Sequence, residues 1–184
     1  QDVLGFLPKI FGKEIRKIVM NKSYRNTVEI ASYANHLAGI TDMDLFERHG
    51  EPVEEKVFSG NSGEALENGL EEILKKLWLG ENQFETAAVI MRTEEEARKA
   101  AGILKAKLEA TGFDTENHFS YLHRDSTSFC KGITVTTFYL AKGLEFDQVF
   151  SLFPKADQSP IARQGRYIAA TRALHRLHMY EYGK

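Results

Sequence analysis

The chain has 184 residues, of which 42% are apolar and 27% are charged, and its formal net charge is −2 at pH 7. This composition is ordinary for a globular domain, and the length is enough to bury a core. The near-neutral charge disfavours a chain that coats nucleic acid over its whole surface, so any nucleic-acid contact would be local. The single cysteine, Cys130, excludes an intrachain disulfide and a thiolate zinc cluster.

Two sequence signals that would change the class of protein do not occur in the 184 residues. One is a membrane segment or signal peptide, and without it we expect no membrane partner and a cytoplasmic location. The other is the phosphate-binding sequence G-x-x-x-x-G-K-[ST]. A nucleotide site built on this chain would therefore need its phosphate loop from elsewhere.

Strand and helix patterns alternate along the chain. Helix ends are marked by Asn26 or Thr27 before the first helix, by Gly39 after it, and by a capping box formed by Thr93 and Glu96. Residues 41–51 are predicted as a loop, 60–63 as a turn, and 113–130 show no clear pattern. Apolar periodicity predicts strands at 14–20, 54–58, 86–91, 133–137, 148–153 and around 177–182, and helices at 28–38, 65–79, 94–110 and 167–173.

This alternation predicts a mostly parallel sheet with helices on both faces. No repeat, low-complexity tract or linker divides the sequence. We therefore interpret residues 1–184 as a single α/β domain.

The stretch from Gly132 to Phe153 carries the strongest chemical signal. Between its two strand patterns lie Lys142, Gly143, Glu145 and Asp147. A glycine-containing turn with a cation and carboxylates at the end of a strand is typical of a ligand site in an α/β sheet, although a solvated charge cluster would have the same composition.

Three motifs resemble those of UvrD/Rep-type superfamily 1 helicases. Residues 137–146 resemble T-x-H-x-A-K-G-L-E-F, with six consecutive matches from Ala141 to Phe146, and residues 167–173 resemble Y-V-A-x-T-R-A. Residues 24–35 resemble N-Y-R-S-T followed by a helix with I-x-x-x-A-N, with Asn26 in place of the usual serine. A weaker match of two residues, Arg92 and Thr93, follows the strand at 86–91.

The resemblance implies the second, C-terminal RecA-like domain of such a motor, a P-loop NTPase-like fold without its own Walker A loop. We expect the chain to be a fragment of a longer motor protein, inactive alone, whose N-terminal RecA-like domain supplies the phosphate loop and the magnesium ligands. The cofactor would be ATP with Mg²⁺. By the match, Tyr24 would stack on adenine, Gly143 would let the backbone approach the nucleotide, Glu145 would bind the ribose, and Arg25 and Arg172 would reach the γ-phosphate as catalytic residues.

The resemblance also implies contacts with single-stranded DNA through Arg92, Thr137, Tyr139 and Lys142. Tyr139 stands where most of these helicases have a histidine, and a tyrosine can still stack on a base. The same substitution is similar to the HelD-like branch, whose members act on RNA polymerase. RNA polymerase is therefore a second candidate partner.

Three functions remain open from the sequence. The chain is a motor domain, a non-catalytic module that binds nucleic acid or protein, or an independent nucleotide-binding protein, which is disfavoured by the missing phosphate loop. For the motor domain, the carboxyl ends of parallel strands meet at one edge of the sheet. We therefore expect Tyr24, Arg25, Gly143, Glu145 and Arg172 to converge there.

Overall fold

The structure, a computed structural model, describes residues 22–23, 26–39, 44–45, 50–79, 84–126 and 130–184. The predicted strand at 14–20 and two of the predicted site residues, Tyr24 and Arg25, lie outside the described residues. Most of the predicted loop at 41–51 lies outside them as well.

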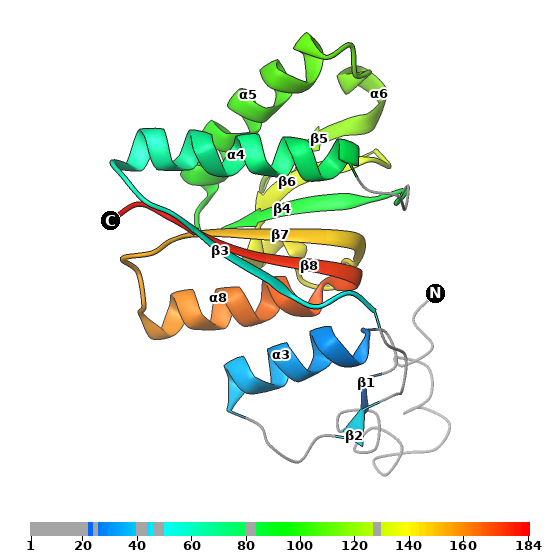
Figure 1. Cartoon of the computed structure of the whole chain (residues 1–184). Helices are drawn as coiled ribbons and strands as arrows, with labels where there is room; N and C mark the ends of the chain where they lie inside the picture. Colours follow the sequence, from blue (N-terminus) through cyan, green and yellow to red (C-terminus); the bar gives the residue numbers. More distant parts are fainter. Residues whose placement is uncertain (1–21, 24–25, 40–43, 46–49, 80–83, 127–129) are drawn as a thin grey trace.

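Six parallel strands form one sheet in the order β3-β8-β7-β4-β6-β5 (Figure 1). The prediction of a mostly parallel sheet is confirmed. Two short parallel strands, β1 (Lys22–Ser23) and β2 (Asp44–Leu45), form a separate sheet. The strands of the main sheet are β3 (Glu54–Phe58), β4 (Ala87–Met91), β5 (Phe119–Tyr121), β6 (Ile133–Thr137), β7 (Phe146–Pro154) and β8 (Ala173–Tyr182).

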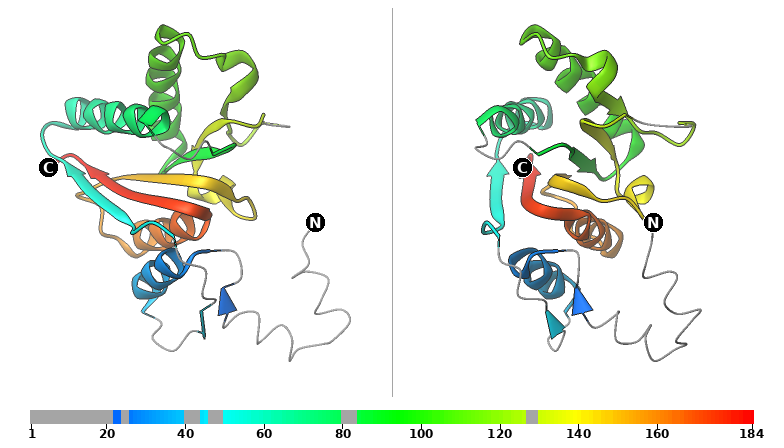
Figure 2. Two further views of the ribbon diagram at one scale, coloured as in Figure 1. Left: turned by 45° about the vertical axis from the view of Figure 1, so that its right-hand side comes forward. Right: turned by 90° about the vertical axis from the view of Figure 1, so that its right-hand side faces the viewer.

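Helices cover both faces of the sheet, as the alternating pattern predicts (Figure 2). One face carries α3 (Val28–Ala38), α7 (Phe138–Ala141) and α8 (Pro160–Thr171). The other face carries α4 (Ser62–Leu79) and α5 (Glu94–Ala110), and the short helix α6 (Thr115–His118) leads into β5. Of the helices in the described ranges, none is long and apolar enough to span a membrane.

The core has two parts, one on each face, because successive side chains of a strand point to opposite sides. Strand β4 shows this directly, since all five of its residues are buried. Val89 and Met91 pack towards α4 and α5, whereas Ala88 and Ile90 pack towards α3, α7 and α8. A strand buried on both faces explains the continuous apolar run at 86–91.

The sequence placed one helix wrongly. Residues 167–173 were predicted as the helix, but α8 begins at Pro160 and ends at Thr171, and Ala173 already belongs to β8. The start is set by Ser159, whose hydroxyl accepts a hydrogen bond from the Ala162 amide, and by proline in the first turn. The helix also packs closely on α7, since a Cβ built on Gly165 would lie 2.7 Å from the Phe138 ring.

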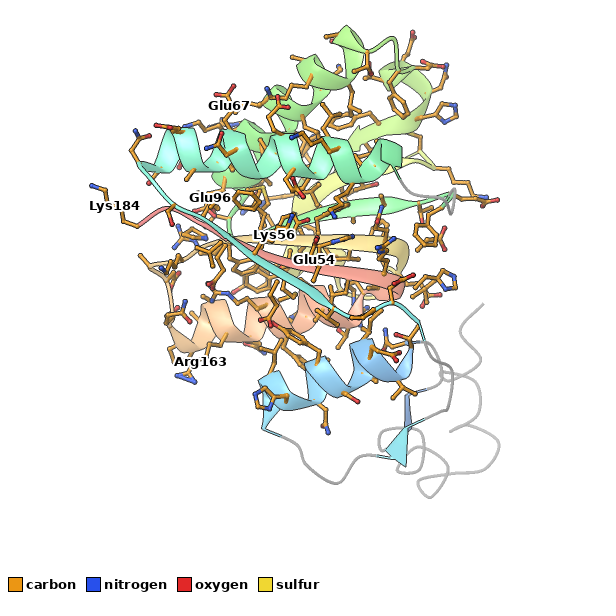
Figure 3. All side chains as sticks on the ribbon, in the orientation of Figure 1. Glu54, Lys56, Glu67, Glu96, Arg163 and Lys184 are labelled. Atoms are coloured by element: carbon orange, nitrogen blue, oxygen red, sulfur yellow. The ribbon has the colours of Figure 1, made fainter. Side chains whose placement is uncertain are left out.

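A polar cluster lies between strands β3 and β8 and helix α4, and Figure 3 labels two of its members, Glu54 and Lys56. His178 is 1% exposed, and its Nδ1 lies 2.7 Å from the Glu54 carboxylate and its Nε2 lies 3.1 Å from Gln148 Oε1. The Tyr180 hydroxyl donates to the same carboxylate oxygen, and Lys76 of α4 lies 3.1 Å from the other. The cluster therefore ties the edge strand β3 to its neighbour and to the covering helix.

The pKa values of His178 and Glu54 are both lowered, but for different reasons: burial lowers the pKa of His178, and hydrogen bonds lower the pKa of Glu54. Burial lowers the pKa of His178 to about 4, and the hydrogen bond to Glu54 only partly opposes it. Burial raises the pKa of Glu54, but hydrogen bonds from Tyr180, His178 and Lys76 outweigh burial and lower it to about 2. At neutral pH the cluster thus holds a neutral imidazole beside a carboxylate.

Candidate functional site

Gly143, Glu145 and Arg172 come together at one edge of the sheet, as predicted, but the edge is the opposite of the one expected. They lie at the amino ends of β7 and β8, where Phe146 is paired with Ala173, rather than at the carboxyl ends of the strands. The reason is the direction of the chain, because α7 and α8 each carry it from the carboxyl edge back to the amino edge before the next strand. The prediction of the carboxyl edge was therefore wrong.

Arg172 joins the two motifs at this edge. Its Nη1 donates to the Leu144 carbonyl oxygen at 3.0 Å, and its Nη2 donates to the Thr171 hydroxyl at 3.3 Å. Its own carbonyl accepts a hydrogen bond from the Phe146 amide at 2.9 Å. Arg172 follows the last residue of α8, so the end of the helix, the Gly143 turn and the start of β7 are fixed to one another.

The Gly143 turn is open to solvent. Gly143 has φ of +82°, and a Cβ built there would have no atom within 4 Å. The glycine is therefore required by the backbone conformation and not by close packing. The side chains of Lys142 and Glu145 on either side of it are exposed. The edge thus presents a turn, a carboxylate and a half-buried guanidinium on one open surface.

Asn26 brings the third motif to the same edge. Its Nδ2 donates to the carbonyl oxygens of Thr171, at 3.3 Å, and of Ala173. Thr27, and not Asn26, caps α3, by accepting from the Ile30 amide at 3.2 Å. Tyr24 and Arg25 themselves lie outside the described residues, but Asn26 follows them directly in the sequence and lies beside Arg172.

Sequence reasoning missed this role of Asn26, which it treated as one of two capping candidates. The available signal was the residue type, since an amide nitrogen donates two hydrogen bonds where the serine of the motif donates one.

Replacing Asn26 with alanine is expected to lower the free energy of unfolding by about 1–3 kcal/mol, because two carbonyl oxygens lose their shared donor. Asn26→Asp keeps the shape but places a carboxylate against the same oxygens, so we expect it to destabilise the chain more than alanine does. Chemical denaturation of the two variants measures both effects. An aspartate variant as stable as the original chain would contradict this role.

Asp147, the fourth member of the polar cluster seen in the sequence, has a structural role. Its carboxylate accepts hydrogen bonds from the amides of Glu85 and Thr86, at 3.0 and 3.1 Å, and its own amide donates to the Thr86 hydroxyl at 2.8 Å. These contacts hold the start of β7 to the start of β4. The part of the cluster available to a ligand is therefore the segment from Lys142 to Glu145.

The residues predicted to bind nucleic acid fall at different places. Arg92 follows β4 at the carboxyl edge, where it is paired with two carboxylates, Glu96 and Asp157, the latter at 2.7 Å. The hydrogen bond with Glu96 is the main cause that raises the pKa of its guanidinium. Its charge is therefore already balanced within the domain.

The other three predicted residues surround helix α7. Thr137 is 5% exposed and caps the helix by accepting a hydrogen bond from the Leu140 amide at 3.4 Å. It is therefore too buried to contact a ligand and instead fixes the start of α7. Tyr139 is 59% exposed, and the Lys142 ammonium lies 5.5 Å from the centre of its ring. Tyr139 and Lys142 therefore form an accessible pair of an aromatic ring and a cation.

No metal site is visible in the part of the chain that the structure describes, where no group of three histidine, cysteine or acidic side chains is arranged to hold an ion. The open edge from Lys142 to Arg172 offers a guanidinium and exposed backbone instead. These groups suit contacts to an anionic ligand.

Comparisons with known proteins bear on the family and the fold of the chain. Residues 132–180 match the family model of the UvrD-like helicase C-terminal domain. The C-terminal domain of a possible DNA helicase from Lactobacillus plantarum WCFS1 has the same fold, with a TM-score of 0.63 and 24% sequence identity over 88% of this chain and 89% of that one. An arterivirus nonstructural protein 10 helicase solved with DNA has a TM-score of 0.43 and 15% identity, over 70% of this chain and 28% of that one. No curated protein sequence matches the chain.

The chain therefore has a RecA-like α/β fold, with one parallel sheet covered by helices on both faces. The matched segment contains the Gly143 turn and Arg172, and with the shared fold it supports a UvrD/Rep-type superfamily 1 C-terminal domain. This match covers the two motifs at 137–146 and 167–173, and the motif at 24–35 lies outside it.

Proposed function

We propose that this domain is the C-terminal motor domain of an ATP-dependent DNA helicase or translocase. In this proposal it contributes one wall of an ATP site that it shares with an N-terminal RecA-like domain. The observation that carries the proposal is the meeting of three distant motifs at one edge, where Asn26 donates to the Thr171 and Ala173 carbonyls and Arg172 donates to the Leu144 carbonyl. An edge built only for stability would not need an exposed turn and carboxylate beside these contacts.

Each residue at this edge has a chemical role in the proposal. Arg172 is the arginine finger, whose planar guanidinium presents several donors to phosphoryl oxygens. Glu145 accepts hydrogen bonds from the ribose hydroxyls, and Gly143 leaves its backbone open to the nucleotide. Tyr24 and Arg25, which precede Asn26, would supply the adenine stack and the second guanidinium. Mg²⁺, held by the N-terminal domain, would neutralise charge on the phosphates.

The proposed path of single-stranded DNA runs over Tyr139 and Lys142. An exposed ring stacks on bases of any sequence, and a neighbouring cation binds the phosphate backbone. Thr137 holds α7 in place for this contact. Arg92 lies at the same edge, next to the residue that pairs with Thr137, but its charge is already paired with Glu96 and Asp157, so it contributes less. An action on RNA polymerase, as in the HelD-like branch, stays a prediction that rests on Tyr139 alone, and a cytoplasmic location stays an expectation.

A non-catalytic binding module with the same fold is the main alternative. It would use Tyr139 and Lys142 without ATP, and then the contacts of Arg172 would serve stability only. The two functions differ in their dependence on a second domain, and therefore ATP hydrolysis separates them.

The 184-residue chain alone is expected to show no ATP hydrolysis, because it contains no lysine and serine or threonine of a phosphate loop to bind the β- and γ-phosphates and magnesium. Phosphate release at saturating ATP and Mg²⁺ measures this, with heat-inactivated protein as the background. Adding the N-terminal domain of the same protein is expected to restore turnover. Hydrolysis by the chain alone, above that background, would overturn the shared-site proposal.

A further inference from the structure

A second cavity lies away from the Gly143–Arg172 edge, between helices α3 and α8 and strands β3, β7 and β8. Its volume is about 300 Å³, within the range of small-molecule sites. Figure 3 shows Arg163 near the start of α8, on the side of α3. We call this space the α3–α8 cavity, and its polar lining includes Glu55, Lys56, Ser151, Arg163, Arg166 and Glu181.

Two buried polar groups of the cavity have no hydrogen-bond partner among the residues that the structure describes. One is the hydroxyl of Ser151, a residue that is 1% exposed, and the other is Nε of Arg166, which is 6% exposed. Buried donors of this kind are rare, because an unmade hydrogen bond in the interior is unfavourable. Two such groups at one cavity favour a ligand that accepts hydrogen bonds from them.

The position of Arg166 is fixed by its other nitrogens. Nη1 donates to the Asp157 carbonyl at 2.8 Å, and Nη2 donates to the Pro154 carbonyl at 3.0 Å and lies 2.9 Å from Glu181. The guanidinium also lies 5.1 Å from the centre of the Phe153 ring. Because Nη1 and Nη2 are both held by these contacts, the guanidinium cannot rotate to bring its Nε–H towards another partner.

Ser151 lies next to this guanidinium. Ser151 and Phe153 are two residues apart on β7, and residues at this spacing point to the same face of a sheet. The Arg166 group stacked on Phe153 therefore has Ser151 as its neighbour along the strand. Both residues line the same cavity.

The charges of the lining favour an uncharged ligand. The lining holds three cations, Lys56, Arg163 and Arg166, and two carboxylates, Glu55 and Glu181. The charge of Lys56 is paired with Glu72 at 2.5 Å, outside the lining, which leaves two cations against two carboxylates. Glu55 also accepts a hydrogen bond from the Tyr33 hydroxyl at 2.9 Å. An anion would gain from the arginines but would be repelled by the two carboxylates. The rest of the lining is partly apolar and includes Leu37, Val57 and Met179.

We propose that the α3–α8 cavity is a binding site for small uncharged molecules that carry an amide or ketone oxygen. The oxygen accepts from Arg166 Nε and the Ser151 hydroxyl, and the apolar part of the molecule packs on Leu37, Val57 and Met179. This site shares no lining residue with the Gly143–Arg172 edge, so the proposal does not depend on the proposed ATP site.

The test uses the ¹⁵N-labelled chain and the NMR signal of Arg166 Nε–H, titrated with N-methylacetamide as the probe. We expect a saturable shift of this signal at millimolar probe, as is usual for a ligand of this size. Ser151→Ala is expected to weaken binding about 10-fold, by removing one of two donors. Ser62→Ala, an exposed serine at the start of α4, is the matched control and should leave the titration unchanged.

Three results would overturn the proposal. A shift that does not saturate, or one that is equal in Ser151→Ala, means that the cavity holds only water. Stronger binding of acetate than of N-methylacetamide means that the ligand is an anion. Thermal melts check that the variants are folded. Since the Ser151 hydroxyl has no described partner, Ser151→Ala should melt at a temperature no lower than that of the original chain.

Discussion

Replacing Arg172 with alanine, in a protein that carries this domain together with its phosphate-loop domain, is expected to lower ATP turnover by about 10³–10⁵-fold. Arginine fingers in other phosphoryl-transfer enzymes have effects of this size, because they stabilise charge that develops in the transition state. Arg172→Lys keeps the charge but loses the planar set of donors, so turnover should remain strongly impaired. Single-turnover hydrolysis at saturating ATP separates this effect from weaker binding.

The contacts of Arg172 require a stability control for this experiment. Both variants lose the hydrogen bond from Nη1 to the Leu144 carbonyl, and we expect a loss of about 1 kcal/mol in the free energy of unfolding. Arg98→Ala, at an exposed arginine of α5, is the matched surface control and should change neither property. Near-normal turnover in a folded Arg172→Ala protein would leave Arg172 with its structural role alone.

Acidification from pH 6.5 to pH 4 is expected to lower the free energy of unfolding by about 3 kcal/mol through His178. The pKa of His178 is about 4 in the folded chain and near 6.5 when unfolded. The unfolded chain therefore takes up the proton first, and stability that is fully present above pH 6.5 is lost as the pH falls to 4. The lowered pKa of Glu54 acts in the same direction at lower pH, between 4.5 and 2.

Urea denaturation at a series of pH values measures this dependence. His178→Gln removes the titrating group and should flatten the curve between pH 6.5 and 4, even if the variant is less stable at neutral pH. His118→Gln, at an exposed histidine of α6, is the control and should keep the original slope. An unchanged slope in His178→Gln would show that other groups cause the acid sensitivity.

The sequence was informative wherever local periodicity and burial agree. Strands β4 and β6 are buried along their whole length, so their apolar and β-branched runs predicted them well. Strand β5 and helix α6 were missed, because β5 is three residues long and too short to show a period of two. Periodicity also carries no information on the order of strands, and therefore β8 could not be placed between β3 and β7.

The candidate site was predictable only in part. The motifs indicated that Gly143 and Arg172 would meet, but the edge was wrong because the sequence does not show where α7 and α8 return the chain. The pairing of Arg92 with Asp157 was also out of reach, because Asp157 lies 65 residues further along the sequence. The pairing with Glu96 had a signal, the four-residue spacing, that the sequence reasoning did not use. The α3–α8 cavity had no sequence signal, because a buried arginine in a helix looks the same as an exposed one.

The place of β8 in the sheet has a consequence for synthesis on the ribosome. Strand β8, residues 173–182, pairs with β3 on one side and with β7 on the other, although β3 is made more than 100 residues earlier. While the chain emerges, β3 has no neighbour in the sheet, and the part of α4 that packs on β8 is left uncovered. We therefore expect the nascent domain to depend on chaperones until β8 has left the exit tunnel, since exposed strand edges and apolar surface promote aggregation.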